Sequence, residues 1–321
     1  MSQPLPGETL DHYRIEKLVA RSGMASIFKA EDLINNRMVA IKFPHPEMEA
    51  DVVTFDRFQR EQEIGKKLDH PGVMKVYNGE KRTGQYMVME WVDGRLLRHI
   101  MNEQKKFSPE RATTIVSRVL HALNYIHSQG VVHRDLKPEN IMVNSNDEIK
   151  LIDFGIAGME GARRLTFAKL SQVMGTPDYI APEQVKGKRG DGRTDIYAMG
   201  VMLYELLTGE TPFKGPNPFA IMNDRLLNNP VPPRELDASI TPEMQEIIYR
   251  AIERDPKNRY PHAREFAKDL EHQDQVGVAD RAELKEWKKK KSPVLRNILF
   301  YGMLAAIPVV VLGLLLWVAR H

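Results

Sequence analysis

Short apolar segments separated by polar residues dominate the first part of the chain. Segments rich in Val, Ile, Phe or Tyr occupy residues 13–19, 26–31 and 38–43, and each predicts a short β-strand. Residues 51–68 are predicted to be helical, and Tyr86-Met87-Val88-Met89 has the composition of a buried strand. This part of the chain is therefore expected to form a small, strand-rich unit with one helix.

From about residue 95 onward, helical apolar spacing dominates. One run places its apolar side chains on a single helical face, which predicts a core helix: Ile115, Val119, Ala122, Leu123 and Ile126. A hairpin interrupts this helical part. It consists of the apolar run 141–143, the polar turn 144–147 and the apolar run 149–152.

The end of the chain holds one long apolar run. Residues 298–319 carry no charge, and at roughly 1.5 Å per residue they would span about 33 Å, enough for a bilayer core. Lys288–Lys291 and Arg296 precede the run, so the positive-inside rule puts the preceding part of the chain in the cytoplasm. The alternative, a buried core helix, would have only Arg320 and His321 after it. A membrane span is therefore expected.

The other end gives no sign of export. Residues 1–15 lack the apolar core of a signal peptide, so we expect a single-pass, tail-anchored protein of the inner or plasma membrane. Residues 272–297 would form a charged, helical linker. Its lysine cluster would either contact anionic lipid or only set the topology, and the sequence leaves both readings open.

Composition narrows the class of protein only a little. The 321 residues leave room for about two lobes or domains. A net charge of +3 is too small to indicate nucleic-acid binding, and the absence of cysteine excludes disulfides, zinc–thiolate sites and a catalytic thiol. The 10 histidines show no metal-ligand spacing. A reducing compartment is consistent with this composition.

The hairpin is expected to bring two oxygen-bearing side chains together. Asn140 precedes its first strand and Asp153 follows its second, so the two should lie side by side. Amide and carboxylate oxygens suit Mg²⁺ and the phosphates it carries, rather than zinc. Asp135 lies five residues before Asn140, close enough to accept a proton from an attacking hydroxyl. This is the layout of a phosphotransfer site.

The run resembles the catalytic loop and the magnesium-binding Asp-Phe-Gly of protein kinases, and further motifs of that family occur in order. They are Val39-Ala40-Ile41-Lys42, His133-Arg134-Asp135-Leu136-Lys137-Pro138-Glu139-Asn140, Asp153-Phe154-Gly155, Gly175-Thr176-Pro177-Asp178-Tyr179-Ile180, Ala181-Pro182-Glu183, Asp195 with Gly200, and Arg259. In the family, the arginine at the position of Arg259 pairs with the glutamate that is Glu183 here. The resemblance covers residues 13–271 and is to the eukaryotic-like kinases of bacteria.

The resemblance implies an α+β, bilobal protein kinase fold, with a small β-rich N-lobe and a larger α-helical C-lobe, followed by one C-terminal transmembrane helix. The expected boundaries are an N-terminal tail at 1–12, the N-lobe and hinge at 13–92, the C-lobe at 93–271, a juxtamembrane linker at 272–297 and the transmembrane helix at 298–319. The implied reaction transfers the γ-phosphoryl group of ATP, with Mg²⁺ or Mn²⁺, to serine or threonine hydroxyls of protein substrates.

The resemblance also assigns roles within the site. Asp135 would orient the substrate hydroxyl and accept its proton, and Lys137 would neutralise the moving phosphoryl group. Thr176 would bridge these two residues. Asn140 and Asp153 would hold the magnesium ion. The position of Lys137, two residues after Asp135, resembles serine/threonine kinases rather than tyrosine kinases.

Lys42 needs a carboxylate partner to orient it toward the nucleotide phosphates, and the predicted helix offers two. At about 100° per residue, Glu61 lies on the apolar face with Phe58, whereas Glu63 points to the opposite side. A carboxylate on an apolar face is costly unless it is paired. Glu61 is therefore the expected partner of Lys42.

The glycine-rich loop that covers the phosphates in kinases is altered in this chain. Its three glycine positions hold Ala20, Ser22 and Ala25, and only the additional Gly23 remains. Small side chains still permit close approach to a nucleotide, but they lose the conformational freedom of glycine. We expect nucleotide binding to persist in a weakened or slower form.

By resemblance, Met89 lines the adenine pocket, and the backbones of Glu90 and Val92 bond the base. The residues expected to contact the nucleotide are Val19, Ala20, Ser22, Gly23, Ala25, Ile27, Ala40, Lys42, Met89, Glu90, Val92, Asn140 and Asp153.

Arg134, next to the expected base, suggests regulation. Kinases with this arginine often order the segment after Asp-Phe-Gly by pairing it with a phosphate there. The expected phosphorylation sites are Thr166 and Ser171, and a homodimer would phosphorylate itself in trans. The nearby Arg163-Arg164 is equally well explained as an ordinary solvated loop.

Two other functions compete with a protein kinase. A membrane-anchored pseudokinase, a nucleotide-binding scaffold without turnover, is favoured by the altered glycine loop. Retention of Lys42, Glu61, Asp135, Asn140 and Asp153 argues against it. A kinase of small molecules is disfavoured by the segment 175–183, which resembles a protein-docking loop.

Overall fold

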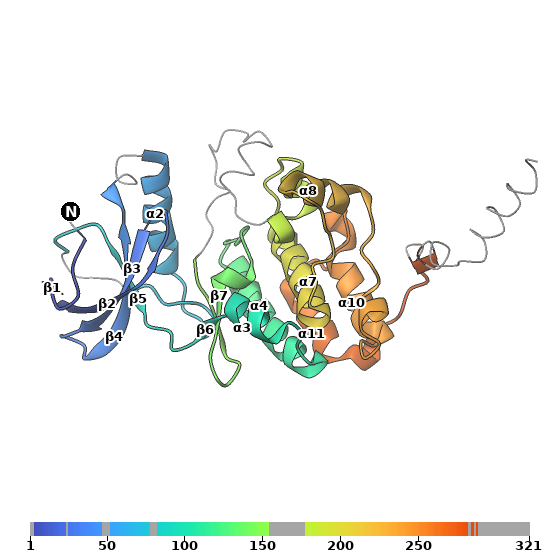
Figure 1. Ribbon diagram of the computed structural model, residues 1–321, viewed down its shortest axis with the longest axis horizontal. Coiled ribbons are helices and arrows are strands. Elements are labelled where there is room, and N and C mark those ends of the chain that lie inside the picture. Colours follow the sequence, from blue (N-terminus) through green and yellow to red (C-terminus); the bar gives the residue numbers. More distant parts are fainter. Residues whose placement is uncertain are drawn as a thin grey trace, which may run out of the picture. The chain divides into compact units, whose positions relative to one another are not determined.

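The computed structural model of the protein describes residues 3–23, 25–46, 52–77, 82–153, 177–281, 284–285 and 287. The chain divides into two units, Met1–Gly277 and Val278–His321. Almost all described residues belong to the first unit. Within that unit a strand-rich N-lobe, blue in Figure 1, is followed by a mainly helical C-lobe, green to orange.

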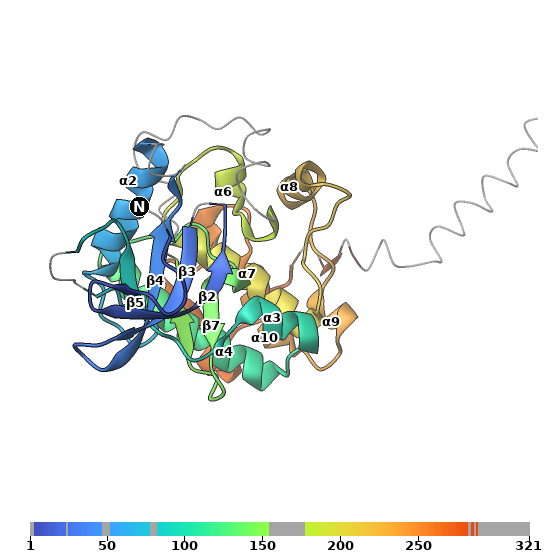
Figure 2. The same ribbon diagram turned by 60° about the vertical axis from the view of Figure 1, so that its left-hand side comes forward.

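The N-lobe is built on one antiparallel sheet with the strand order β1-β2-β3-β4-β5. The strands are β1 (Thr9–Leu10), β2 (Tyr13–Arg21), β3 (Ala25–Asp32), β4 (Arg37–Pro44) and β5 (Met87–Glu90). Helix α2 (Val52–Gly65) precedes β5 along the chain and lies beside the sheet (Figure 2).

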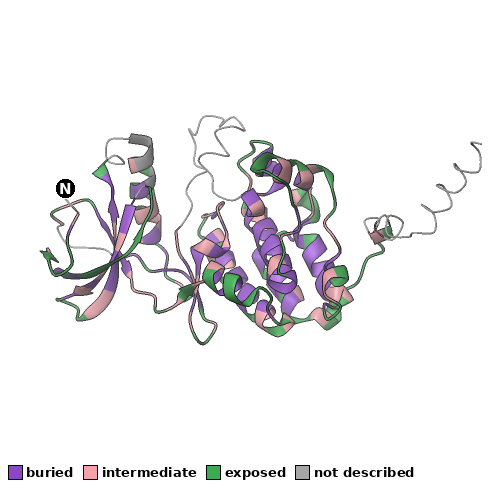
Figure 3. Ribbon diagram, viewed as in Figure 1, coloured by how far each residue is buried: buried purple, intermediate pink, exposed green. Residues whose placement is uncertain are grey.

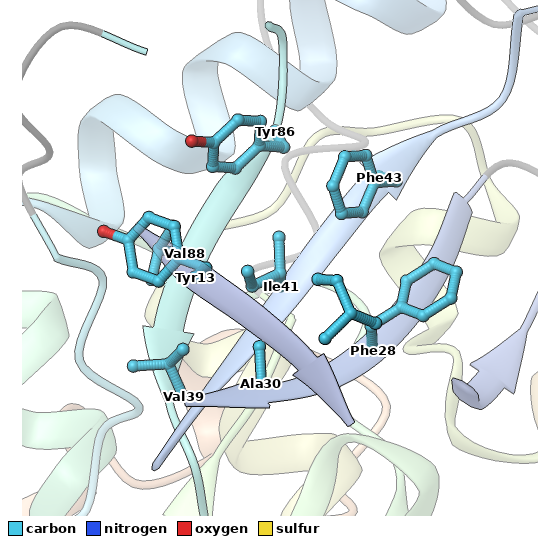
Figure 4. Close-up of a cluster of buried hydrophobic side chains, with 9 residues drawn as sticks. Tyr13, Phe28, Ala30, Val39, Ile41, Phe43, Tyr86 and Val88 are labelled. Carbon is cyan, nitrogen blue, oxygen red and sulfur yellow. The ribbon is translucent and has the colours of Figure 1, made fainter. Parts of the chain in front are cut away.

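One face of this sheet carries the aromatic core of the N-lobe, to which β2, β3, β4 and the β5 region all contribute (Figure 4). The core residues are Tyr13, Ile15, Phe28, Ala30, Val39, Ile41, Phe43, Tyr86 and Val88. Phe43 packs edge-on against Phe28 at 5.6 Å and stacks on Tyr86 at 5.3 Å between ring centroids. Because side chains alternate along a strand, the intervening residues, including Lys42, lie on the opposite face.

That opposite face meets α2. Its buried cluster consists of Ala40, Phe58, Met74, Val76, Met87 and Met89. The α2 backbone lies close to this cluster at Gly65, where a Cβ atom would be only 2.3 Å from Cγ2 of Val76. Lys42, which pairs with Ile27 across the β3–β4 ladder, therefore emerges beside α2 and its carboxylates.

The C-lobe begins with a small sheet in the order β6-β7-β8, formed by Arg95–Leu96, Ile141–Val143 and Ile149–Leu151. Its α-helices are α3 (Leu97–Gln104), α4 (Pro109–Ser128), α6 (Pro182–Val185), α7 (Gly192–Thr208), α8 (Pro218–Leu227), α9 (Pro233–Leu236), α10 (Pro242–Ala251) and α11 (Ala263–Glu271). Short 3₁₀ turns are η1 (Pro138–Asn140), η2 (Pro177–Tyr179), η3 (Pro256–Asn258) and η4 (Gln273–Gln275).

Helix α7 is the central helix of the C-lobe and is buried along almost its whole length (Figure 3). Ile196 and Met199 are fully withdrawn from solvent. Asp191 caps its first turn by accepting the N–H of Arg193, and Gly209, at φ 75°, ends it in the left-handed conformation. Since α7 contacts both α4 and α10, a group fixed on it is fixed relative to the whole lobe.

Gly200 sets the distance between α7 and α10. A Cβ atom at this position would lie 2.6 Å from Cβ of Ala251 and 2.8 Å from Cγ2 of Ile252. Those distances are shorter than any relaxed contact, so the two helices pack at a separation that only glycine permits. In the Asp195–Gly200 motif noted in the sequence, the glycine is thus required by the packing of the two helices.

The bilobal kinase fold expected from the sequence is present. The predicted strands at 13–19, 26–31 and 38–43 correspond to β2, β3 and β4, and the run through Ile115 and Ile126 lies within α4. The segment expected as a tail, 1–12, contributes the edge strand β1, whose two residues are too few to give a strand pattern. No helix among the described residues is long and apolar enough to cross a membrane, and the expected span at 298–319 lies outside those residues.

We predict that Gly200→Ala lowers the free energy of unfolding by about 2 kcal/mol, because overpacking a tight helix contact typically costs about 1–3 kcal/mol. The sign is diagnostic, since glycine to alanine in a helix would otherwise stabilise by about 1 kcal/mol. Urea unfolding followed by circular dichroism measures the effect. Thr114→Ala, at an exposed position of α4, is the control and should be neutral or slightly stabilising. An unchanged or raised stability for Gly200→Ala would contradict the packing argument.

Candidate active site

The β7–β8 hairpin brings Asn140 and Asp153 together, as the sequence predicts. The N–H of Ile152 donates to the carbonyl of Asn140 at 2.9 Å, so the two ends of the hairpin are tied backbone to backbone. Asp153, the next residue, is held at φ 55°, a left-handed conformation that is costly for a non-glycine residue. This backbone conformation turns the carboxylate of Asp153 away from the direction that a continued β-strand would give it.

The loop before the hairpin gathers the expected catalytic groups. Nζ of Lys137 donates to Oδ2 of Asp135 at 2.8 Å. Nδ2 of Asn140 donates to the carbonyl of Asp135 at 2.7 Å, which closes the loop on itself. The side chain of Asp135 remains 40% exposed, so a substrate hydroxyl can reach it.

Lys42 forms the ion pair that was expected with Glu61. Its Nζ lies 3.0 and 3.2 Å from the two carboxylate oxygens of Glu61. It also donates to Oδ1 of Asp153 at 2.8 Å, a contact between β4 and the hairpin that spans 111 positions of the sequence. Glu63 is exposed and pairs with Lys66 on its own helix at 2.7 Å, so the helical-wheel choice between the two glutamates is confirmed.

The ammonium group of Lys42 therefore bonds two carboxylates, and this excess of negative charge shifts the pKa values of the three groups. Burial alone would lower the pKa of Lys42, but Asp153 and Glu61 outweigh it and raise that pKa. The ammonium of Lys42 holds the pKa of Asp153 below its ordinary value. Burial raises the pKa of Glu61 to about 7. The trio carries more negative than positive charge at neutral pH.

This arrangement fits a divalent cation bound together with phosphates. The excess charge is negative, and the carboxylate of Asp153 is 43% exposed. Asn140 is buried and uses its amide nitrogen to bond the carbonyl of Asp135, so its amide oxygen is the atom that could ligate a cation. Among the described residues, no cluster of three His, Asp or Glu side chains forms a metal cage of its own. Few protein oxygens completed by substrate phosphates and water are typical of Mg²⁺ sites.

Asp195 anchors the catalytic loop to α7. Its side chain is fully buried, and its two oxygens accept the backbone N–H groups of His133 and Arg134 at 2.9 and 2.8 Å. A third bond, 2.7 Å long, joins it to Nε2 of His127 on α4. Arg134 has φ 63°, and the two backbone bonds hold it in that strained conformation. Burial would raise the pKa of Asp195, but these hydrogen bonds outweigh it and lower that pKa.

The expected phosphate-covering loop is the β2–β3 turn. Ser22 closes it: its N–H donates to the carbonyl of Ala25 at 2.9 Å, and its Oγ accepts the N–H of Ala25 at 3.1 Å. Val19, Ala20, Ser22 and Gly23 are exposed, whereas Ala25 is buried. The serine that replaces a glycine thus ties the turn through its own side chain.

Of the residues expected to contact the nucleotide, Ala40 and Met89 are buried in the cluster beneath the sheet, and Ile27 packs against it. At the hinge, the N–H of Glu90 donates to the carbonyl of Lys75 at 2.9 Å. The carbonyl of Glu90, rather than its N–H, is then the group that a bound base could use.

The expected pairing of Glu183 with Arg259 is confirmed. The two side chains form two parallel bonds of 2.8 and 2.7 Å, and Thr194 also donates to Glu183 at 2.9 Å. Several expected site residues lie outside the described residues: Phe154, Gly155, Thr166, Ser171 and Thr176.

Sequence reasoning missed Arg225 of α8. This side chain is fully buried and donates to the carbonyls of Pro177 and Ile180 at 2.7 and 2.6 Å, and also to that of Asp178. It therefore fixes η2, the segment that directly follows the expected bridging threonine. The sequence carried no signal for this role, since an arginine on an amphipathic helix is ordinarily a surface residue.

Comparison with known proteins places these features in a family. The family model described as "Protein kinase domain" matches residues 13–272. The "Serine/threonine-protein kinase PknB" of Mycolicibacterium smegmatis is 37% identical over 270 residues, which is 83% of this chain and 43% of that protein. The "Probable serine/threonine-protein kinase SCO3848" of Streptomyces coelicolor is 39% identical over 264 residues, 81% of this chain and 39% of that protein.

Solved structures agree at the level of the fold. The crystal structure of the Mycobacterium tuberculosis PknI kinase domain has a TM-score of 0.64 and 28% identity, covering 84% of this chain and 100% of that one. The matched region spans roughly two fifths of the length of the two curated relatives given above.

Asp195→Asn should lower the free energy of unfolding by about 3 kcal/mol, because an amide cannot accept both backbone N–H groups and the histidine bond as the carboxylate does. The effect should also depend on pH. A carboxyl whose pKa is lower in the folded chain stabilises the fold above its unfolded value of 3.8, and this is lost as pH falls through the folded pKa. The difference between wild type and variant should therefore be constant near neutral pH and narrow below about pH 4.

Urea unfolding at a series of pH values measures this difference. Asp69→Asn is the matched control, because Asp69 is 82% exposed and its pairing with Lys75 should contribute less than about 1 kcal/mol. A difference for Asp195→Asn that stays constant down to pH 2, or one no larger than that of the control, would refute the anchoring role.

Proposed function

The chain belongs to the protein kinase family, and from this premise we propose that it is a serine/threonine protein kinase that uses ATP. The proposal rests on two contacts at the ends of one hairpin. Lys137 bonds Asp135 before the first strand, and Lys42 bonds Asp153 after the second. The names of the curated relatives, which are serine/threonine-protein kinases, support serine and threonine as the residues that receive the phosphoryl group.

Asp135 is the proposed acceptor of the hydroxyl proton. As the substrate oxygen bonds to the γ-phosphorus, the bond to the β-phosphate oxygen breaks, ADP leaves and the proton passes to Asp135. Lys137, 2.8 Å from Asp135, holds that carboxylate in place and places a positive charge beside the moving phosphoryl group. Both effects lower the barrier through positioning and charge, not through a covalent intermediate.

Lys42 would hold the nucleotide phosphates on the other side, with Glu61 fixing its direction. Asn140 and Asp153 would hold Mg²⁺ or Mn²⁺. The metal would offset the negative charge that develops on the phosphate oxygens. Lys42 also bonds Asp153 directly, so the side chains of the site pair with one another.

We predict that purified full-length protein with Mg²⁺ and labelled ATP transfers label to a generic protein substrate. Asp135→Asn should lower this rate by a factor of about 10²–10⁴, the usual contribution of general acid–base catalysis. Its unfolding temperature should stay unchanged, because the side chain is 40% exposed. Asp274→Asn, an exposed carboxylate in η4, is the control and should retain activity.

The same assay separates the alternatives. Nucleotide binding by the wild type without label on itself or on any protein would favour a scaffold with the altered phosphate loop. Label transferred only to small-molecule alcohols would favour the small-molecule kinase.

Membrane anchoring is a second part of the proposal, and it is supported by the sequence alone. The uncharged run 298–319 follows the lysine cluster 288–291, the order expected for a span with the kinase domain on the cytoplasmic side. A substrate or partner at the cytoplasmic face of a bacterial inner membrane would then be encountered in two dimensions.

We expect the full-length protein to resist extraction from membranes by alkaline carbonate. Val309→Arg with Leu312→Arg should release it to the soluble fraction, because each arginine near the centre of a span costs about 3 kcal/mol on insertion scales. Leu227→Arg, on an exposed leucine of α8, is the control and should leave the distribution unchanged. Soluble wild-type protein would exclude the anchor.

Autophosphorylation is the third part. The Nε atom of Arg134 is buried and meets no acceptor among the described residues. Burial and the neighbouring Arg189 lower its pKa, so an anion beside it would be stabilised. We propose that phosphorylation of Thr166 or Ser171, by a second copy of the chain, supplies that anion. Phosphopeptide mapping of the labelled wild-type protein tests this, and a fully active, unmodified protein would exclude it.

A further inference from the structure

An arginine lies between two carboxylates beside the catalytic loop. Arg98, on α3, donates from Nε to Glu139 at 2.9 Å and from Nη1 to Glu205 at 2.9 Å. Its Nη2 bonds the hydroxyl of Tyr179, which in turn donates to Glu205. The side chains of Arg98 and Glu205 are only 20% and 12% exposed. Each of the three nitrogens of this guanidinium thus donates to an acceptor within the chain.

The position of these groups ties them to the proposed reaction. Glu139 is in η1, two residues after Lys137 and four after Asp135. Tyr179 is in η2, the turn held by Arg225. A protein substrate whose hydroxyl reaches Asp135 must therefore place its neighbouring residues close to this cluster.

A surface groove of about 580 Å³ starts at the cluster. Its charged lining residues are Arg98, Lys105, Lys106, Glu205 and Glu210. It contains three cations and two carboxylates, and both carboxylates are already paired, Glu205 with Arg98 and Glu210 with Lys214. The groove thus offers a bound peptide no unpaired negative charge.

Two carboxylates beside a catalytic base would ordinarily form a subsite for a basic side chain, because a guanidinium can bond both of them and satisfy its own donors. Here Arg98 makes those bonds instead. Burial works against the charge of Arg98, but Tyr179, Glu205 and Glu139 outweigh burial and raise its pKa. Arg98 is therefore a permanent cation in its site.

We propose that Arg98 is a specificity-determining residue: it fills from within the chain an acidic subsite formed by Glu139 and Glu205, so the kinase does not select arginine or lysine near the acceptor hydroxyl. This inference rests on the proposed protein kinase function and adds to it the class of substrate that is disfavoured. Removing Arg98 should uncover the carboxylates and create a preference for basic substrates.

The structure also allows a different role, which the experiment must separate. Arg98 joins α3, η1, η2 and α7, so its loss would loosen the catalytic loop even without a subsite. A purely positioning role predicts a slower reaction with every peptide by the same factor. A specificity role predicts a change in the ratio between peptides that differ in a single side chain.

The experiment uses full-length protein in detergent and a positional set of Ser/Thr peptides that carry Arg or Ala at each site around the acceptor. For the wild type, kcat/KM for Arg peptides should be within about twofold of that for Ala peptides. Arg98→Ala should raise the Arg/Ala ratio about tenfold or more at one or two sites, the factor that one charge-assisted hydrogen bond supplies.

Three variants control the result. Arg95→Ala removes a neighbouring arginine that is 53% exposed and pairs with Glu103, and it should leave the ratio unchanged. Adding Glu139→Gln and Glu205→Gln to Arg98→Ala should return the ratio to that of the wild type. If Arg98→Ala does not fold, Arg98→Gln keeps a donor for one carboxylate and should shift the ratio in the same direction by a smaller factor.

The outcomes are distinct. A wild type that already prefers Arg peptides, or folded variants that slow all peptides equally, would overturn the inference and leave the proposed function intact. A wild type that phosphorylates no protein or peptide would instead overturn the proposed function, and this inference with it.

Discussion

The buried carboxylate of Asp195 is the interaction on which the active site depends. It lies on α7, the helix most enclosed by the rest of the C-lobe, and accepts the backbone N–H groups that begin the catalytic loop. These bonds, together with the side-chain amide of Gln184, which donates to the carbonyl of Arg134 at 2.9 Å, hold Arg134 at φ 63°, a conformation that is costly for any residue with a side chain. The loop geometry is thus maintained by the C-lobe core, and its strain is offset by the stability of that core.

A second constraint is the shortage of positive charge around Lys42. One ammonium bonds two carboxylates that come from different elements, α2 and the segment after β8. An excess of carboxylates over cations in a partly buried site is costly. Binding a metal and phosphates at Asp153 would relieve that cost, and Lys42 would keep its pairing with Glu61. The cluster is therefore stable enough to fold and yet favours a ligand that brings its own cation.

The sequence predicted those parts of the site whose partners are local or periodic. Strand composition located β2 to β4, the hairpin pattern joined Asn140 to Asp153, and the helical wheel separated Glu61 from Glu63. It gave no role for Arg98 or Arg225, although the resemblance to a family gave one for Arg259. Arg98 and Arg225 find their acceptors 41 to 107 positions away, and a buried arginine has the same sequence signature as an exposed one. The left-handed backbone at Asp153 could not be predicted from the sequence either, because it results from the closure of the hairpin and not from the residue type.

These unpredicted arginines connect substrate recognition to the rigidity of the fold. Arg225 fixes the carbonyls of η2, and Arg98 bonds Tyr179 in the same turn and the two carboxylates beside it. The surface proposed to meet a substrate is therefore assembled from groups that already satisfy one another. Altering the charge of that surface at one residue therefore has a cost in stability, since removing a cation leaves a largely buried carboxylate without its ion-pair partner. In the proposed kinase, selectivity is thus coupled to stability, because a substitution that changes substrate preference also removes bonds from the network that positions the catalytic loop.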